Sequence, residues 1–123
     1  MIVADTSVWV DFLKGGSPIL GLFVQEGAIL MHELIECELS LWTPPKRHAL
    51  ILKIRNMDYA CIADNDHVLE FIEEHQLMGK GIGYVDCNLL ASCTGGNVKH
   101  QLWTLDKRLR EMAIQLGINF DAE

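Results

Sequence analysis

Short apolar runs alternate along the chain with longer segments in which apolar residues recur every three or four positions. The runs predict strands at residues 1–4, 28–31, 59–63, 100–105 and 118–120. The first run does not alternate with polar residues, which is typical of a strand buried on both faces in a parallel sheet. The periodic segments predict helices over residues 7–14, 18–26, 32–42, 46–55, 84–94 and 107–116, and one further helix that begins after Asp64. Strands and helices therefore alternate, which predicts an α/β fold.

One acidic residue interrupts the apolar face of the helix predicted over residues 32–42. At about 100° per residue this face consists of Met31, Leu34, Ile35, Leu39, Leu41 and Trp42. Glu38 lies in its middle. Because burial of an unpaired carboxylate costs several kcal/mol, we expect Glu38 to have a partner there. That partner is either a buried Lys or Arg or a bound cation.

A second acid, Asp86, lies among the apolar positions of the helix predicted over residues 84–94. The buried face of this helix is predicted to consist of Ile82, Val85, Leu89, Leu90 and Cys93. An acid in the first turn interacts favourably with the helix dipole, by about 0.3 to 1 kcal/mol. This interaction explains an acid early in the helix, but it does not explain an acid on the apolar side.

Two further acids each follow a predicted strand and precede a predicted helix. Asp5 ends the first apolar run, and Asp106 follows the run at 100–105. Taken alone, Asp106 is explained by an N-cap role. However, open α/β sheets bind ligands at the carboxyl ends of their strands, where acids from neighbouring strands meet. We therefore expect Asp5 and Asp106 to lie close together.

The four acids together predict a metal site. Two unit charges about 4 Å apart repel by about 4 kcal/mol at an effective dielectric near 20, so a close group of carboxylates binds protons or cations. Oxygen ligands without matching His or Cys favour Mg²⁺ or Mn²⁺ over zinc. Such ions support phosphodiester hydrolysis. No G-x-S-x-G motif indicates a covalent nucleophile instead.

Composition narrows the class of protein. The 123 residues suit a single domain, and half of them are hydrophobic, which is enough for a core. The net charge of −7 argues against binding of nucleic acid by bulk electrostatics, so any such contact must be local. The cysteines lack a Cys-x-x-Cys pair and are expected to be reduced and buried; they are Cys37, Cys61, Cys87 and Cys93. The chain has no basic leader and no apolar stretch of about 20 residues, so we expect a soluble cytoplasmic protein without a membrane span.

Four segments, in order, resemble the signatures of a nuclease family. They are residues 5–12 (DTSVWVDF), His32 with Glu38 and Leu39, residues 81–92 (GIGYVDCNLLAS) and residues 102–109 (LWTLDKRL). These segments are similar to those of PIN-domain ribonucleases, and most similar to VapC-type toxins of bacterial toxin–antitoxin pairs. The resemblance covers nearly the whole chain. It implies a single PIN domain over residues 1–123, a three-layer α/β/α sandwich with a central, mainly parallel sheet of four to five strands.

The resemblance also implies an activity, partners and site residues. The activity is that of a Mg²⁺- or Mn²⁺-dependent endoribonuclease acting on structured RNA such as tRNA or rRNA. The partners are a second copy in a homodimer and an inhibitory VapB-type antitoxin. Asp5 and Asp86 would be the principal metal ligands, and Glu38 and Asp106 would complete the site. The hydroxyls of Thr6 or Thr104 would orient water or a phosphate.

The resemblance implies a role for the basic residues in binding RNA. Seven of the ten lie in two clusters, at residues 46–55 and 107–110. We expect one or both clusters to contact RNA phosphates, which position a substrate without reading its sequence. The named candidates are Lys46, Arg47, Lys107 and Arg108. Candidates for an apolar surface that binds an antitoxin helix, or alternatively for the core, are Trp9, Leu13, Trp42 and Pro44.

Three alternatives are left open by the sequence. A receiver domain is also a small acidic α/β domain, but it requires adjacent acids after the first strand and a lysine after a late strand. This chain has a single acid, Asp5, at the first place and Asp106 at the second. A phosphatase built on Asp-x-Asp is disfavoured because Ser7 occupies the second acidic position. A PIN domain that binds without cleaving is the third alternative.

Overall fold

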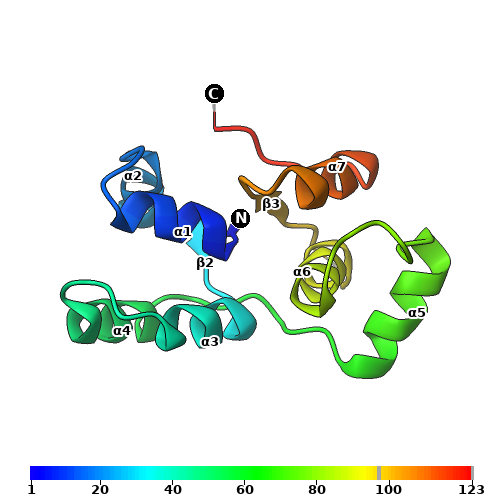
Figure 1. Ribbon diagram of the computed structural model, residues 1–123, viewed down its shortest axis with the longest axis horizontal. Coiled ribbons are helices and arrows are strands. Elements are labelled where there is room, and N and C mark those ends of the chain that lie inside the picture. The colour runs from blue at the N-terminus through cyan, green and yellow to red at the C-terminus, as the bar shows by residue number, and fades with distance from the viewer. Residues whose placement is uncertain (97, 123) are drawn as a thin grey trace.

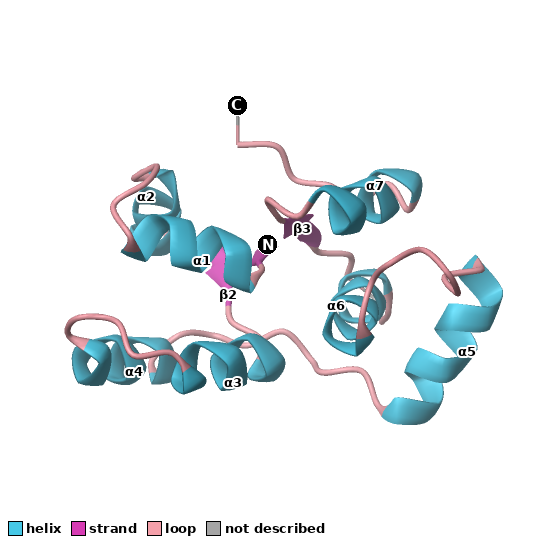
Figure 2. Ribbon diagram, viewed as in Figure 1, coloured by secondary structure: helices cyan, strands magenta, loops and turns pink. Residues whose placement is uncertain are grey.

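A parallel sheet of three strands forms the centre of the computed structural model, which describes residues 1–96 and 98–122. Strand β1 (Ile2–Ala4) lies between β2 (Ile29–Leu30) and β3 (Gln101–Trp103), as Figure 2 shows. Val3 lies opposite Leu30 on one side and Leu102 on the other, and all three side chains are buried. Burial on both faces explains why β1 lacks polar alternation.

The sheet has fewer strands than the four to five that were predicted. The run at 59–63 contributes one parallel bridge, between Tyr59 and Met31, and the run at 118–120 contributes one between Asn119 and Leu102. Both runs lie where an edge strand would lie, but neither pairs over more than one residue. The predicted α/β class and the parallel direction of the sheet are confirmed.

The described residues form seven helices, in agreement with the seven predicted ones. They are α1 (Thr6–Leu13), α2 (Ile19–Gln25), α3 (Glu33–Leu41), α4 (Arg47–Arg55), α5 (Asn65–His75), α6 (Tyr84–Thr94) and α7 (Lys107–Gln115). Gly27 and Gly117 follow α2 and α7 with positive φ values of 71° and 72°, which glycine adopts without a steric penalty. No described helix combines the length and the apolar character needed to cross a membrane.

The helices surround the sheet in two groups (Figure 1). Helices α1 to α4 lie toward the β2 edge, and α5 to α7 lie toward the β3 edge. Helix α1 packs on β1, α2 and α3, whereas α6 packs on β3 and α5. Because β1 and β3 are parallel neighbours, the segments that leave their carboxyl ends, toward α1 and α7, emerge at the same edge of the sheet.

Several side chains lie elsewhere than the sequence pattern predicts. Leu41, assigned to the apolar face, is 86% exposed. Only Ile35 and Leu39 of α3 are fully buried, so the buried stripe of this helix is narrower than predicted. Cys37 and Cys61 are exposed, contrary to the expectation of four buried thiols. Cys61 lies in the segment that forms only one bridge with the sheet.

Candidate active site

Asp5 is a buried carboxylate at the carboxyl end of β1. It is the N-cap of α1, where its Oδ1 accepts a hydrogen bond from the Val8 N–H (3.3 Å). The Ser7 hydroxyl donates to the same oxygen, and the Thr104 hydroxyl donates to Oδ2 at 2.5 Å. Burial raises the pKa of Asp5, and these hydrogen bonds oppose the rise because they favour the charged form. The carboxylate is therefore held in one orientation by two hydroxyls.

The same hydroxyls connect Asp5 to the segment after β3. Ser7 Oγ accepts a hydrogen bond from the Leu105 N–H (3.0 Å), and Thr104 Oγ1 accepts one from the Asp106 N–H (3.0 Å). Asp106 in turn caps α7 by accepting from the Leu109 N–H (3.0 Å), so its N-cap role is confirmed. Ser7 is a site residue that the sequence analysis did not propose, although its position two residues after Asp5 was noted.

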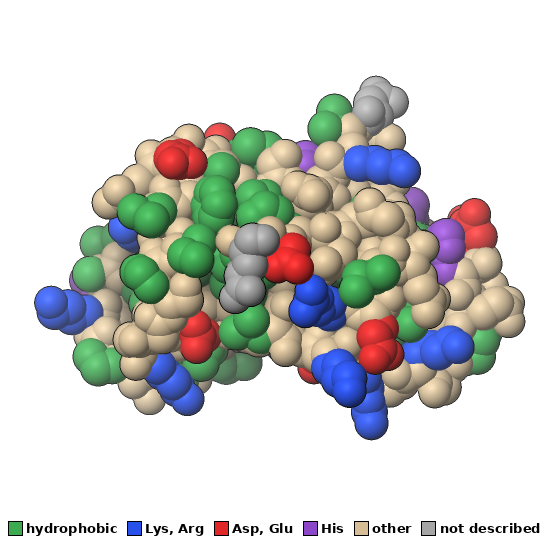
Figure 3. Space-filling model, turned by 90° about the horizontal axis from the view of Figure 1, so that it is seen from above, with side chains coloured by type: hydrophobic (Ala, Val, Ile, Leu, Met, Phe, Trp, Pro, Cys, Tyr) green, Lys and Arg blue, Asp and Glu red, His purple; other side chains and the backbone are tan. Residues whose placement is uncertain are grey.

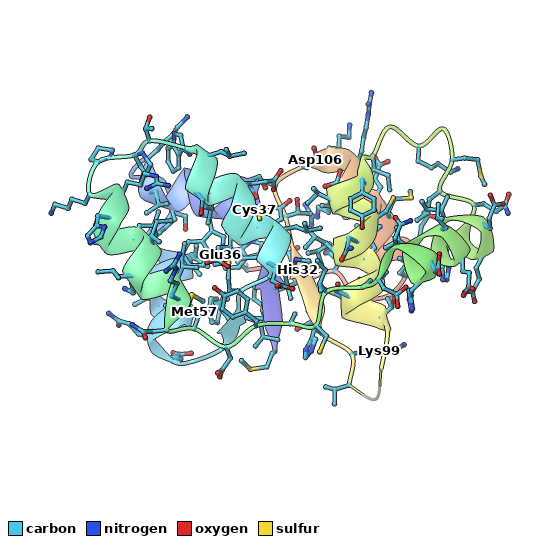
Figure 4. All side chains as sticks on the ribbon, turned by 90° about the horizontal axis from the view of Figure 1, so that it is seen from below. His32, Glu36, Cys37, Met57, Lys99 and Asp106 are labelled. Carbon is cyan, nitrogen blue, oxygen red and sulfur yellow. The ribbon has the colours of Figure 1, made fainter. Side chains whose placement is uncertain are left out.

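Asp86 lies in the first turn of α6 and is half-buried. Its Oδ2 accepts a hydrogen bond from the Gly83 N–H (3.3 Å). Burial raises the pKa of Asp86, and the negative charges of Asp106, Asp5 and Glu38 raise it further. Figure 4 shows Asp106 beside the end of α6 at which this helix begins. The charges of three acids from separate segments of the chain thus act on the carboxylate of Asp86.

Glu38 lies at the rim of the site and not in the core. The sequence placed it in the middle of a buried face, but its side chain is exposed. The error follows from the narrow buried stripe of α3, which leaves Glu38 at its border. The Thr6 hydroxyl donates to Glu38 Oε1 at 2.5 Å, across the contact between α1 and α3. A buried ion pair with Lys or Arg, the alternative explanation, is excluded for this residue by its exposure.

The donor atoms of the site fit a hard divalent cation. All four side chains offer carboxylate oxygens, the ligands that Mg²⁺ and Mn²⁺ prefer. Among the described residues, no three His, Cys, Asp or Glu side chains are placed closely enough to hold a metal ion. Asp86 and Asp106 instead accept hydrogen bonds within their own segments, and Asp5 accepts them from Ser7 and Thr104. A cation would therefore have to replace some of these hydrogen bonds as it draws the oxygens together.

The basic candidates fall into two different settings. Lys107 and Arg108 are exposed in the first turn of α7, directly after Asp106. Lys46 is exposed before α4 and lies beside an apolar groove. The guanidinium group of Arg47 donates to the carbonyl oxygens of Ser40 (2.5 Å) and Trp42 (3.1 Å) at the end of α3. Arg47 therefore already has a structural role between α3 and α4.

A buried network of hydrogen bonds holds together two helices that carry acids of the site. The sequence analysis did not predict this network. The side chain of His32 is fully buried between α3 and α6 (Figure 4), and burial lowers its pKa. Its Nδ1 accepts from the Leu34 N–H (3.1 Å), so Nε2 carries the proton and donates to Ser92 Oγ (2.9 Å). Ser92 Oγ donates to Asn88 Oδ1 (3.1 Å). The chain of hydrogen bonds fixes α3, which carries Glu38, against α6, which carries Asp86.

Asn88 is expected to be a major contributor to stability. The predicted buried face of α6 did not include it, but Asn88 is fully buried, and its side chain bonds the N–H (3.2 Å) and carbonyl (2.9 Å) of Ala63. Replacement by Ala leaves these backbone groups without partners, at a cost of about 1–3 kcal/mol. Urea denaturation of Asn88→Ala should show a reduced free energy of unfolding. Asn65→Ala, at an exposed position, is the control, and equal stability of the two variants would contradict the prediction.

Comparison with known proteins identifies the family. No protein-family model matches the chain. The protein named Ribonuclease VapC32, from two strains of Mycobacterium tuberculosis, is 32% identical over 120 residues, which cover 96% of this chain and 94% of that protein. This relation excludes the receiver domain and the Asp-x-Asp phosphatase as classes for this chain. The chain belongs to the VapC-type PIN-domain ribonucleases.

Proposed function

We propose that this protein is an endoribonuclease that uses Mg²⁺ or Mn²⁺, and that Asp5, Glu38, Asp86 and Asp106 form its catalytic site. The observation that carries the proposal is the environment of Asp86, whose pKa is raised by burial and by the charges of the other three acids. Within residues 1–96 and 98–122, none of the four forms an ion pair with a basic side chain. Like charges that face one another without basic partners favour the binding of a cation.

The proposed roles of the acids follow from their burial. Asp5 and Asp86 are less exposed than the other two and serve as the principal metal ligands, while Glu38 and Asp106 complete the site at its rim. The divalent ion, when bound, supplies polarisation of a phosphate oxygen and activation of water. The chain itself fixes the orientation of the ligands through neighbouring groups, because outer hydrogen bonds of this kind determine how a ligand points.

Two hydroxyls have proposed supporting roles. Thr104 holds Asp5 by donating to its carboxylate, and Thr6 holds Glu38 in the same way. Neither hydroxyl donates to solvent as placed, so each acts first on a carboxylate. A phosphate that enters the site would compete with Glu38 for the Thr6 hydroxyl, which lies at the more exposed of the two positions.

We propose structured RNA of the tRNA or rRNA class as the substrate. Its phosphates would be bound locally by Lys107 and Arg108, beside the acids, with Lys46 and Arg47 as further candidates at the α3–α4 end. The net charge of −7 is compatible with this arrangement because phosphate contacts depend on nearby cations. Figure 3 shows Lys and Arg side chains next to acidic ones on the α7 side of the molecule.

We also propose that the protein is a cytoplasmic toxin, a homodimer of single-domain chains, held inactive by a VapB-type antitoxin. An apolar groove of about 270 Å³ between α1, α2 and α4 supports a site for an antitoxin helix. Of the proposed residues, Trp9 and Leu13 line this groove, whereas Trp42 and Pro44 do not. Lys46 and Lys53 at its margin would favour acidic residues in the bound segment.

The decisive test is incubation of the purified protein with total tRNA and rRNA in Mg²⁺ or Mn²⁺, with and without excess EDTA. Cleavage at defined positions that is abolished by EDTA and by Asp5→Asn is expected. Asp58→Asn, which changes an exposed acid outside the site, is the control. Cleavage that persists in EDTA or in Asp5→Asn would refute the mechanism. RNA binding without cleavage would instead identify a PIN domain that only binds.

A further inference from the structure

The guanidinium group of Arg108 lies directly against the backbone of Gly81. A Cβ atom built on Gly81 would lie 2.5 Å from Nη1, 2.9 Å from Cδ and 3.0 Å from Cζ of Arg108. These separations are shorter than ordinary contacts between non-bonded heavy atoms, which are about 3.5–4.0 Å. Any side chain at position 81 would therefore displace Arg108 from its present place.

This contact lies at the rim of the acidic site. Arg108 follows Asp106 by two residues in the first turn of α7. Gly81 precedes Gly83 by two residues, and the Gly83 N–H binds the carboxylate of Asp86. Helix α7 and the beginning of α6 are neighbours in Figure 1. The Gly81–Arg108 contact thus joins the two segments that supply Asp86 and Asp106.

The guanidinium group of Arg108 has no polar partner within the described residues. In the part of the chain that the structure describes, Arg108 makes no hydrogen bond and no ion pair, although Asp106 lies two residues before it in the sequence. It also lies at the positive end of α7, where a cation is disfavoured by about 0.3–1 kcal/mol. A guanidinium group whose donors are free, at a helix end where its charge is disfavoured, is suited to an anion from outside the chain.

We propose that Gly81 is a positioning residue for Arg108, and that Arg108 binds an RNA phosphate beside the acidic site. The inference rests on the proposed ribonuclease function. It adds to that function a residue that determines where the guanidinium group of Arg108 lies. A guanidinium group forms two parallel hydrogen bonds with phosphate oxygens, so its orientation, and not only its charge, affects the affinity for RNA. Glycine at 81 leaves free the space that the guanidinium group occupies against the loop.

The test measures RNA binding in the presence of EDTA, so that cleavage and metal binding do not enter. The probe is a fluorescent RNA hairpin, and the readouts are the dissociation constant and its dependence on salt. Arg108→Ala should weaken binding about tenfold and reduce the salt slope by about 0.7–0.9, the value for one phosphate contact. Arg108→Lys should keep the salt slope and bind RNA with intermediate affinity, because lysine retains the charge but cannot form the two parallel hydrogen bonds.

Gly79 provides a matched control for Gly81. Both glycines have positive φ values, 71° and 77°, so replacement by Ala introduces a similar backbone strain at each. A Cβ at Gly79 meets no atom within 4 Å, whereas one at Gly81 meets Arg108. Gly81→Ala should weaken RNA binding by about three- to tenfold, and Gly79→Ala by less than about twofold. In an Arg108→Ala background, Gly81→Ala should cause no further loss.

Each outcome decides one part of the proposal. Equal RNA affinity of Gly81→Ala and Gly79→Ala, or a further loss in the Arg108→Ala background, would overturn the positioning role. An unchanged affinity and salt slope in Arg108→Ala would overturn the phosphate contact. Thermal melting checks that each variant is folded, and if Gly81→Ala is not, Arg108→Ala and Arg108→Lys still decide the contact. The ribonuclease proposal is tested separately, since it depends on metal-dependent cleavage by the unchanged chain and its loss in Asp5→Asn.

Discussion

Replacement of Asp86 by Asn is expected to lower RNA cleavage by about a hundredfold or more. A bound metal ion contributes several kcal/mol of stabilisation to the charge that develops on the phosphate, and each 1.36 kcal/mol is a factor of about ten in rate. Asp86 is central to this effect because burial and the charges of Asp106, Asp5 and Glu38 all act on its carboxylate. Asn keeps the size of the side chain and an oxygen that accepts the Gly83 hydrogen bond, but it loses the charge.

The measurement is the single-turnover rate of cleavage of one RNA at saturating Mg²⁺ or Mn²⁺. Asp58→Asn, at an exposed position, should cleave at the rate of the unchanged protein. A decrease of less than about tenfold in Asp86→Asn would show that Asp86 is not a principal metal ligand. Circular dichroism of both variants should match the unchanged protein, because Asp86 is half-buried and does not belong to the hydrophobic core.

Addition of Mn²⁺ at neutral pH is expected to raise the midpoint of thermal unfolding by roughly 10 °C. A ligand that binds only the folded state at a hundred times its dissociation constant contributes about 2.7 kcal/mol, and each kcal/mol shifts the midpoint of a domain of this size by about 4 °C. Asp86→Asn should lose most of this shift. In EDTA the same variant should melt no lower than the unchanged protein, because it removes a charge that its surroundings disfavour.

The rise in the unfolding midpoint caused by Mn²⁺ should also depend on pH. The direction of this dependence follows from the pKa values of Asp5 and Asp86. The pKa values of Asp5 and Asp86 are raised above 3.8, so the folded protein binds more protons than the unfolded chain between 3.8 and the raised values. The stability from these two groups is complete below 3.8 and is lost as the pH rises through their folded pKa values. Mn²⁺ displaces these protons, so its stabilising effect should grow with pH over the same range. A shift that is the same in Asp86→Asn, or independent of pH, would contradict a site at these acids.

The placement of the acids shows which features of the candidate site the sequence pattern could predict. Asp5 and Asp106 were predictable as neighbours, because each follows a strand and parallel strands end at one edge of a sheet. Asp86 was predictable as an acid turned toward other elements, since it lies on the apolar side of α6. The charge of Glu38 acts on Asp86, but its predicted burial was wrong, because the angular pattern of α3 overestimated the width of its buried face.

The supporting residues were less accessible to sequence analysis. His32, Ser92 and Asn88 form one chain of hydrogen bonds, but His32, the N-cap of α3, lies 60 residues from Ser92 of α6 along the chain. Polar residues on a helix are expected to face water, and only a neighbouring element with complementary groups reverses this expectation. The contact of Arg108 with Gly81 is equally invisible in the sequence, where Gly79, Gly81 and Gly83 look alike.

The amino-acid sequence by itself determined the order of the helices and of the three paired strands, the parallel direction of the sheet and the choice of the four acids proposed as the site. These properties depend on periodicity, turn residues and chemistry, which are local along the chain. The tertiary structure alone decided which predicted strands pair over more than one residue, which side chains of α3 and α6 are buried, and which hydroxyls hold the carboxylates. Those properties depend on contacts between segments far apart in sequence, and a hydrogen bond such as that from Thr104 to Asp5 exists only after β3 has paired with β1.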